Sequence, residues 1–281
     1  FQEVFSKLAL KELVGDLGFK YFKTVDNARI SKNNDKIYTS TTVAIASKYP
    51  IKNLKKVDID FLALKKHYYE GFFKFAREPI KATICLEDEK ELDVYVCHLK
   101  SNRDNEFEYI FTKDTTLKEK IEKTTKALKE NYSLSLKQRL CEASSLFSDI
   151  KQTNKPSVLL TDLNDKEFSL TIDVLSNIKY HENNLSKDEY LLLDAYHLDK
   201  KELYNPHPEF KGIKRVPTSY FAGKGNVLDY IFISSHFDKK KNNNIGKVSS
   251  YEVFNKHLEK NQNGSLLQSD HAQVVCEIEY L

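Results

Sequence analysis

The 281-residue chain contains no Met and no Trp, and it has only 8 Gly, 6 Pro and 4 Cys. With so few glycines it has no Gly-rich loop that could cradle a phosphate through backbone N–H groups, and it has no G-x-S-x-G motif. Any phosphate chemistry would therefore depend on side chains and a metal ion. No stretch approaches the roughly 18 consecutive apolar residues of a membrane-spanning helix.

The four cysteines form no C-x-x-C pair, which argues against a zinc site built on cysteine. Cys85 and Cys97 lie in neighbouring strand-like segments, so a disulfide across a hairpin and two separate core thiols both stay open. A translated chain begins with Met and this one begins with Phe1, so we expect further residues upstream. A signal peptide among them stays open, and the localisation is unknown.

The charge and size of the chain are those of a globular protein. Lys and Arg number 44 against 41 Asp and Glu, a net charge of +3, and 40% of the residues are hydrophobic. These proportions exclude a disordered, collagen-like or coiled-coil protein. The mild positive charge permits an anionic substrate without requiring one.

Hydrophobic periodicity predicts a mixed α/β protein. Apolar residues at helical spacing predict helices at 4–14, 116–129, 133–150 and 169–177. Short β-rich runs predict strands at 41–47, 79–86, 92–99, 156–162, 226–234 and 272–280, with 79–86 and 92–99 forming a hairpin. The polar segment 51–61 is expected on the surface, and 238–244 is typical of a loop tip.

Several of the hydrophobic strands end in polar residues. Each of these residues has an ordinary structural explanation, such as an Asx turn or a helix N-cap at Asp162. Asp229 is harder to explain in this way, because a carboxylate inside an apolar strand is costly unless it is paired, and a histidine is its natural partner. The side chains in question are His98, Asp162, Asn164, Asp229, Asp270 and His271.

If these groups converge on one edge of a layered sheet, their chemistry is specific. Carboxylates with an asparagine favour a hard cation such as Mg²⁺ over zinc. An Asp–His pair supplies an oriented base or a stabiliser of charge. Asp162 and Asn164 are two residues apart, so on an extended segment both would point into the same site. Together these groups suit the hydrolysis of a phosphate ester.

The order of these motifs along the chain resembles the endonuclease/exonuclease/phosphatase superfamily, whose members share the DNase I-like fold. The resemblance covers residues 2 to about 278. It implies an α/β (α+β) protein folded as a four-layer α-β-β-α sandwich of two packed mixed sheets, with the site at one edge. The matching motifs are Gln2-Glu3-Val4, Arg77-Glu78-Pro79, His98-Leu99, Asp162-x-Asn164, Asp229 in LDYIF, and Ser269-Asp270-His271.

The resemblance also implies roles by position. Glu3 is expected to bind Mg²⁺, with Mn²⁺ as a substitute, and Asp270 to be the second carboxylate near the metal. Asp162 is expected to position or deprotonate the attacking water, and Asn164 to hydrogen-bond the phosphate. His98 and Arg77 are expected to contact the phosphate.

His271, oriented by Asp229, is expected to act as a base or to stabilise the transition state, and both roles stay open. The chain departs from the family pattern in two ways. Thr161 stands where the family has Gly. The family's first strand, which carries an Asn of the metal site, lies upstream of Gln2, so we expect residues 1–281 to be one domain that begins after that strand.

The resemblance predicts a Mg²⁺-dependent phosphoesterase that hydrolyses phosphodiester bonds, most simply a nuclease acting as a monomer. Basic residues that could contact a nucleic-acid backbone are Lys100, Arg103 and the run 239–241. A phospholipid or phosphoinositide phosphoesterase of the same fold is the alternative, and exposure of the aromatic residues Tyr68, Tyr69, Phe72, Phe73 and Phe75 would favour it. A non-catalytic binding module is the third interpretation.

Overall fold

The computed structural model describes residues 1–102, 109–153, 155–181, 191–199, 215–221, 223–242, 244–260 and 268–281. Arg103, one of the basic residues named above, lies outside this part. The α-helices are α1 (Lys7–Asp16), α2 (Phe61–Lys66), α3 (Leu117–Lys129), α4 (Leu134–Thr153), α5 (Leu170–Ser176), α6 (Ala195–Asp199) and α7 (Lys256–Lys260). Short 3₁₀ helices span Glu87–Glu89, Ile178–His181 and Ser235–Phe237.

A six-stranded mixed sheet forms the centre of the molecule, in the order β5-β6-β7-β8-β12-β9. Only β7 and β8 run parallel, and the other neighbours are antiparallel. Its strands are β5 (Ile51–Lys56), β6 (Ile80–Cys85), β7 (Glu91–His98), β8 (Ser157–Asp162), β9 (Leu192–Asp194) and β12 (Asp229–Ser234).

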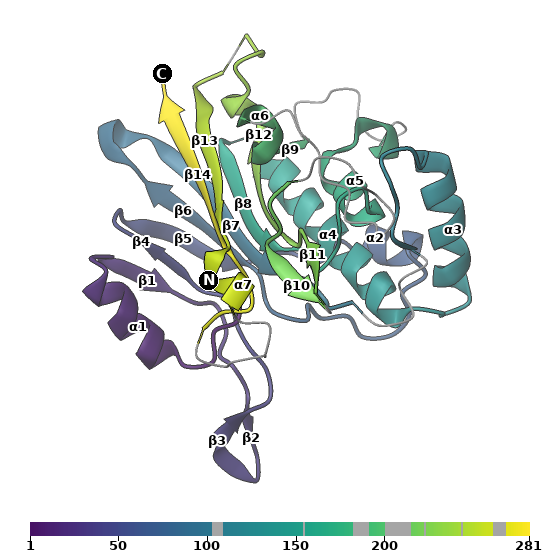
Figure 1. Cartoon of the computed structure of the whole chain (residues 1–281), viewed down its shortest axis with the longest axis horizontal. Coiled ribbons are helices and arrows are strands. Elements are labelled where there is room, and N and C mark those ends of the chain that lie inside the picture. Colours follow the sequence, from purple (N-terminus) through teal and green to yellow (C-terminus); the bar gives the residue numbers. More distant parts are fainter. Residues whose placement is uncertain are drawn as a thin grey trace.

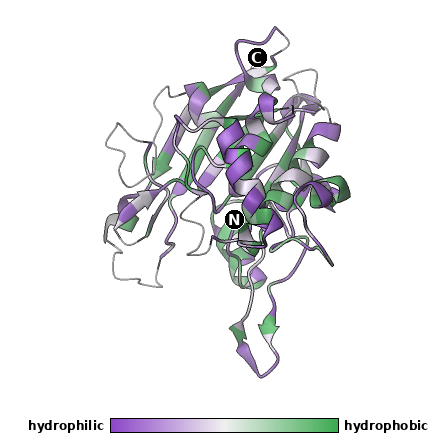
Figure 2. Ribbon diagram, turned by 90° about the vertical axis from the view of Figure 1, so that its right-hand side faces the viewer, coloured by the Kyte–Doolittle hydropathy of each residue, from purple (hydrophilic) through white to green (hydrophobic). Residues whose placement is uncertain are grey.

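The remaining strands form antiparallel two-stranded ribbons. These strands are β1 (Tyr21–Lys23) with β4 (Ile45–Ser47), β2 (Ile30–Ser31) with β3 (Asn34–Tyr38), β10 (Ser219–Phe221) with β11 (Lys224–Asn226), and β13 (Gly246–Phe254) with β14 (Gln273–Tyr280). The β2–β3 hairpin projects from the body of the molecule (Figures 1 and 2).

The two faces of the central sheet pack against different layers, because side chains alternate between the faces along each strand. Tyr95, Leu159 and Phe232 face the helices and form the largest core with residues of α2, α3, α4 and α5. The opposite face packs against the ribbons, where Val94 and Val96 meet Val43 and Ile45, and Ile231 and Ile233 meet Val248 and Tyr251. Figure 1 shows α2, α3, α4 and α5 on one side of the sheet, and β1, β4, β13 and β14 on the other, with α1 outside β1.

The predicted layered α/β fold is therefore present, although the second β layer consists of ribbons in the described part of the chain. The expected helices and strands correspond to α3, α4, α5 and β4, β6, β7, β8, β12 and β14, and β6 and β7 form the expected hairpin. α1 starts later than expected because Ser6 caps it, accepting a bond from the Ala9 N–H, while Val4 bridges to Thr42. Figure 2 shows hydrophobic residues along the central strands and hydrophilic residues on the exposed helix that faces the viewer.

The polar segment 51–61 begins with β5, whose mostly exposed polar residues agree with the expected surface position and suit an edge strand. All four cysteines are free, and Cys85 is opposite Glu91 in the hairpin while Cys97 lies buried against Thr161. No helix in the described ranges is both long and apolar enough to span a membrane.

Candidate active site

Three predicted side chains lie in one row across adjacent strands. His98 is the last residue of β7, Asp162 the last of β8, and Asp229 the first of β12, and Asp162 is in register with both of the others. Residues in register have side chains on the same face of a sheet, here the face that carries Val96, Leu160 and Ile231 toward the ribbons. A hydrophobic face therefore becomes polar in a single step at this end of the sheet.

Asp162 is at the centre of this row. It is 3% exposed, and its Oδ2 lies 3.3 Å from Nε2 of His98 and 3.9 Å from Nδ1 of His271. Burial and the charge of Asp229 raise the pKa of Asp162 above its usual value. Burial, with the nearby charges of Arg77 and His271, lowers the pKa of His98 to about 2, so that this ring is neutral near pH 7.

The expected pair of Asp229 and His271 is present. Oδ2 of Asp229 accepts a hydrogen bond from Nδ1 of His271 at 2.8 Å, although the two residues are 42 positions apart. Burial alone would lower the pKa of His271, but this hydrogen bond and the nearby carboxylates outweigh burial and raise the pKa to about 10. The ring is therefore an imidazolium near neutral pH, with Nδ1 held by Asp229.

Glu3 and Arg77 border this row. Oε1 of Glu3 lies 3.8 Å from Nη2 of Arg77 and 4.0 Å from Nε2 of His98. The bridge between Val4 and Thr42 holds the Glu3 segment against the ribbon layer. Arg77 is fixed by donating from Nη1 to the Leu99 carbonyl at 3.1 Å and from Nε to Thr41 at 3.4 Å. The guanidinium therefore has a defined position beside the Glu3 carboxylate.

Asn164 differs from the expectation of an extended segment. Its φ is +50°, and its backbone N–H donates to Oδ1 of Asp162 at 2.7 Å, which is an Asx turn. Its side-chain Nδ2 donates to the Leu99 carbonyl at 3.1 Å, the same oxygen that Arg77 contacts. Neither Asp162 nor Asn164 caps the following helix, because Ser169 caps α5.

Two residues that sequence reasoning did not single out hold the site in place. Oγ1 of the fully buried Thr218 accepts from the N–H groups of Leu228 and Asp229, at 3.0 and 3.1 Å. The Thr218 carbonyl accepts from the N–H of Ala272, next to His271. Thr218 therefore links the segments of Asp229 and His271. Its sequence context carries no signal for this role, which depends on the packing of distant segments.

Glu142 is the second such residue. It lies on α4, is 1% exposed, and its carboxylate accepts from the backbone N–H groups of Ala76 and Lys100, both at 2.7 Å. Ala76 precedes Arg77, and Lys100 is two residues after His98. The helix layer thus joins the two segments that carry these site residues. The only sequence signal is an acidic residue within the apolar stripe of α4.

The carboxylates of the site could hold a metal ion. Ligand atoms of Asp162, Asp229 and His271 lie within 4.8 Å of one another. However, Nδ1 of His271 is occupied by its hydrogen bond to Asp229, so this ring nitrogen is poorly suited to bind a cation. Glu3, whose side chain is 52% exposed beside the row, has a freer carboxylate. Asp270 is also exposed, and its charge acts on His271. In the described residues no contact joins Glu3 to Asp270.

Comparison with solved structures supports the fold suggested by the motifs. An endonuclease/exonuclease/phosphatase from Beutenbergia cavernae aligns over 97% of this chain with a TM-score of 0.51 and 14% identity. The chain has the endonuclease/exonuclease/phosphatase fold. A Bacteroides vulgatus structure of that name aligns over the whole chain with a TM-score of 0.52 and 14% identity. The human Nocturnin catalytic domain with a bound sulfate anion also aligns over the whole chain, with a TM-score of 0.54 and 15% identity.

The share of each matched protein that this chain covers is smaller. This chain spans 57% of the Beutenbergia protein, 79% of the Nocturnin domain and 83% of the Bacteroides protein. No protein-family model and no curated protein matches the sequence. At these identities the similarity establishes the endonuclease/exonuclease/phosphatase fold, and the activity has to be argued from the site itself.

Proposed function

We propose that the protein is a Mg²⁺-dependent phosphodiesterase whose catalytic centre is the row of His98, Asp162 and Asp229 with His271. The observation that carries this proposal is the convergence of two histidines and two carboxylates at one strand-end edge, with Glu3 and Arg77 beside them. These residues come from segments far apart in the sequence. Burying ionisable groups costs stability, and their convergence in one place is typical of a functional site.

Glu3 and Asp270 would hold the metal ion, because their exposed carboxylates offer the oxygen donors that Mg²⁺ prefers. When bound, the ion would neutralise charge on the phosphate oxygens. Asp162, with its raised pKa, is suited to take a proton from a water molecule near neutral pH. Imidazolium at His271, oriented by Asp229, is suited to stabilise negative charge on the phosphate oxygens in the transition state.

The other residues would position the phosphate. Neutral His98 can donate from Nε2, and Arg77 presents a fixed guanidinium. Asn164 uses one of its two amide N–H groups at Leu99, which leaves the other for a phosphate oxygen. Because the pKa of His271 is raised to about 10 and that of Asp162 is also raised, we favour His271 as the stabilising group and Asp162 as the base.

A nuclease-like substrate is favoured over a lipid. The aromatic residues that would support lipid binding are largely core: Phe73 and Phe75 are 5% and 4% exposed, and Tyr69 packs against them. Of that group only Tyr68 and Phe72 are exposed. The lysines at 239–241 follow the far end of β12 from Asp229, so they do not border the catalytic row. Lys100 does lie near it, two residues after His98.

The proposal is tested by hydrolysis of bis-p-nitrophenyl phosphate, plasmid DNA and p-nitrophenyl phosphate, with Mg²⁺ or with EDTA. We expect diester cleavage that requires the metal and that falls by about 10³-fold in Asp162→Asn, because a positioned base contributes a factor of this order. Asp16→Asn, at an exposed residue ending α1, is the matched control and should retain full activity.

Metal binding is measured separately, by calorimetric titration of Mg²⁺ into the wild type and Glu3→Gln. We expect the variant to bind the ion more weakly. A folded protein that neither binds Mg²⁺ nor cleaves any of the three substrates would contradict the proposed function and favour a non-catalytic module.

A further inference from the structure

A cavity of about 400 Å³ opens beside the catalytic row. Arg77 joins the two: it lines the cavity, and its Nη2 lies 3.8 Å from the Glu3 carboxylate. The other lining residues come from four separate parts of the chain, the Arg29–Thr41 region, the loop after α2, the segment after β7, and α4. They are Arg29, Thr39, Ser40, Thr41, Tyr69, Phe72, Lys74, Phe75, Ala76, Lys100, Ser101 and Gln138.

The charge of this cavity has one sign. Four of its lining residues are cationic (Arg29, Lys74, Arg77 and Lys100), and none of the described lining residues is acidic. Lys74 and Lys100 form no ion pair with any residue in the described ranges. Arg77 lies 3.8 Å from the Glu3 carboxylate, but no carboxylate lines the cavity itself. The cations around it repel one another, so a multiply charged anion between them would be stabilised. The hydroxyls of Ser40, Thr41 and Ser101 add hydrogen-bond donors.

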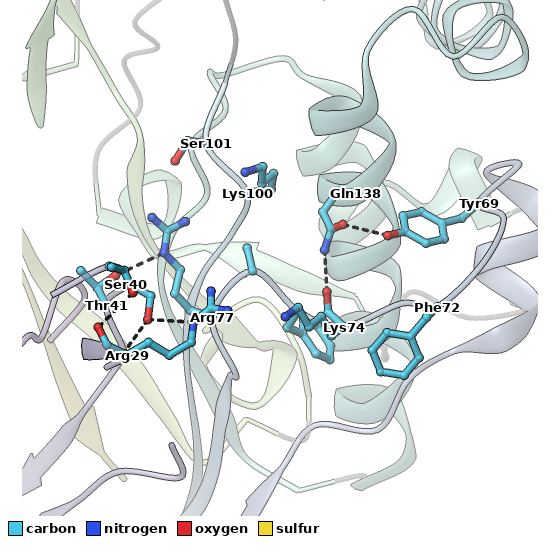
Figure 3. A pocket seen from close by; sticks show the side chains of 13 residues that line it. Arg29, Ser40, Thr41, Tyr69, Phe72, Lys74, Arg77, Lys100, Ser101 and Gln138 are labelled. Atoms are coloured by element: carbon cyan, nitrogen blue, oxygen red, sulfur yellow. Dashed lines mark hydrogen bonds between the residues drawn. The ribbon is translucent and has the colours of Figure 1, made fainter. Parts of the chain in front are cut away.

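The walls are held in place by contacts that do not involve the cationic groups of the lysines. Gln138 donates to the Lys74 carbonyl at 2.7 Å and accepts from the Tyr69 hydroxyl at 3.1 Å. Figure 3 shows Arg29, Thr41 and Arg77 on one side of the cavity, and Gln138, Tyr69 and Phe72 on the other. Glu142, on α4, fixes the backbone at Ala76 and Lys100 by accepting hydrogen bonds from their N–H groups. The site is therefore built before any ligand arrives, which lowers the cost of binding.

Phe72 adds a different surface. Its side chain lines the cavity and yet is 87% exposed, whereas Phe73 and Phe75 beside it are buried. An exposed phenyl ring next to basic groups is suited to stack against a flat ring of a ligand that also carries a phosphate. A nucleotide has both parts, while an inositol phosphate has no flat ring.

We infer that this cavity binds the phosphate and base of a nucleotide unit adjacent to the phosphate that is hydrolysed, and so selects substrates with a second phosphate. This inference rests on the proposed function for the position of the hydrolysed phosphate. Arg29, Lys74 and Lys100 hold the second phosphate, and Phe72 stacks against the base. Arg77 separates this subsite from the catalytic row.

The kinetic test compares thymidine dinucleotide, which has one phosphate, with forms that carry an additional phosphate on the 5′ or the 3′ end. We expect KM to be about tenfold lower for one of the phosphorylated forms, since charge-assisted hydrogen bonds of this kind are worth at least a factor of ten. The double variant Arg29→Gln/Lys74→Gln should abolish that advantage. Its turnover of the unphosphorylated dinucleotide and of bis-p-nitrophenyl phosphate should stay within about twofold of wild type, because these substrates have no second phosphate for Arg29 and Lys74 to contact.

Lys52→Gln is the matched control, because Lys52 is an exposed lysine of β5 that does not line the cavity. It should leave the KM of every substrate unchanged. Equal KM values for dinucleotides with one and two phosphates would overturn the inference. So would a double variant that slows all substrates to the same extent.

A binding experiment separates this inference from the proposed function. Thymidine 3′,5′-bisphosphate, inositol bisphosphate and inorganic phosphate are titrated calorimetrically, without metal, into the wild type, the double variant and Phe72→Ala. We expect the nucleotide to bind most tightly, and to bind about tenfold more weakly to each variant. Loss of this binding in the double variant would uphold the subsite even if no substrate were hydrolysed. Equal binding of the inositol compound, with no effect of Phe72→Ala, would refute the nucleotide specificity.

Discussion

At the scale of single residues, the catalytic row depends on hydrogen bonds that fix the orientation of ionised side chains. His271 is held by the side chain of Asp229, and the backbone N–H of Asp229 in turn donates to the hydroxyl of Thr218. Thr218 is uncharged, and its hydroxyl bonds to backbone N–H groups and not to the side chains of the row. Its hydroxyl only satisfies two buried N–H groups, and this makes it a positioning residue.

Thr218→Val removes that hydroxyl while keeping the shape of the side chain. Two buried N–H groups lose their acceptor, so we expect a loss of about 1–3 kcal/mol in the free energy of unfolding. We also expect kcat to fall by about ten- to a hundredfold with KM little changed, because a small displacement of Asp229 misplaces His271. Thr218→Ser keeps the hydroxyl and should restore kcat. Wild-type kcat in Thr218→Val would contradict the positioning role.

At the scale of secondary-structure elements, the site is assembled where strands end and where α4 passes beneath them. α4 is mostly buried, and several of its polar side chains hydrogen-bond to the backbone of neighbouring segments. Glu142 is the clearest example, since it joins the segment before Arg77 to the segment after His98. Burial raises the pKa of Glu142, while its three hydrogen bonds favour the carboxylate form.

Glu142→Gln tests this junction between α4 and the strands. The amide replaces one acceptor oxygen with an N–H group, which then faces a backbone N–H at either Ala76 or Lys100. We expect the free energy of unfolding in urea to fall by about 1–3 kcal/mol, the usual cost of leaving a buried donor unsatisfied. Glu122→Gln, at an exposed position on α3 that pairs with Lys118, should change it by less than about 1 kcal/mol. Equal effects of the two substitutions would argue against the junction.

At the scale of the whole molecule, the central sheet is covered on both faces, and two of the ionisable groups buried in this way are neutral histidines. His67 is 3% exposed, its Nε2 lies 3.0 Å from the Ser144 hydroxyl, and burial with the charge of Lys66 lowers its pKa to about 3. The pKa of His98 is lowered to about 2. Both rings regain a pKa of about 6.5 when the chain unfolds. The unfolded state therefore binds more protons than the folded state over this range.

Stability should accordingly depend on pH through His67. Its contribution is complete above about pH 6.5 and is lost as the pH falls toward about 3, by up to about 1.4 kcal/mol per pH unit. We expect the wild type to lose stability relative to His67→Gln as the pH falls from 7 to 4. The difference in their unfolding free energies should be constant between pH 7 and pH 8. A difference that does not change with pH would show that His67 is not buried as a neutral ring.

Much of this protein follows from its sequence alone. Helical and strand periodicity located α3, α4 and α5 and most strands of the central sheet, because these segments have regular hydrophobic faces. The change from apolar to polar residues at Leu160 to Asp162, and the lone carboxylate at Asp229, indicated a site at the strand ends. The partnership of Asp229 with a histidine followed from the cost of burying an unpaired carboxylate.

Other features were decided only by the tertiary structure. The register that sets Asp162 opposite both His98 and Asp229 arises from pairing between strands more than 60 residues apart. The support from Thr218 and Glu142, and the burial of Phe73 and Phe75 beside an exposed Phe72, likewise depend on which distant segments pack together. The cationic cavity gathers residues from four such segments. Local sequence patterns carry information about the periodicity of one element, whereas these arrangements are set by contacts between elements.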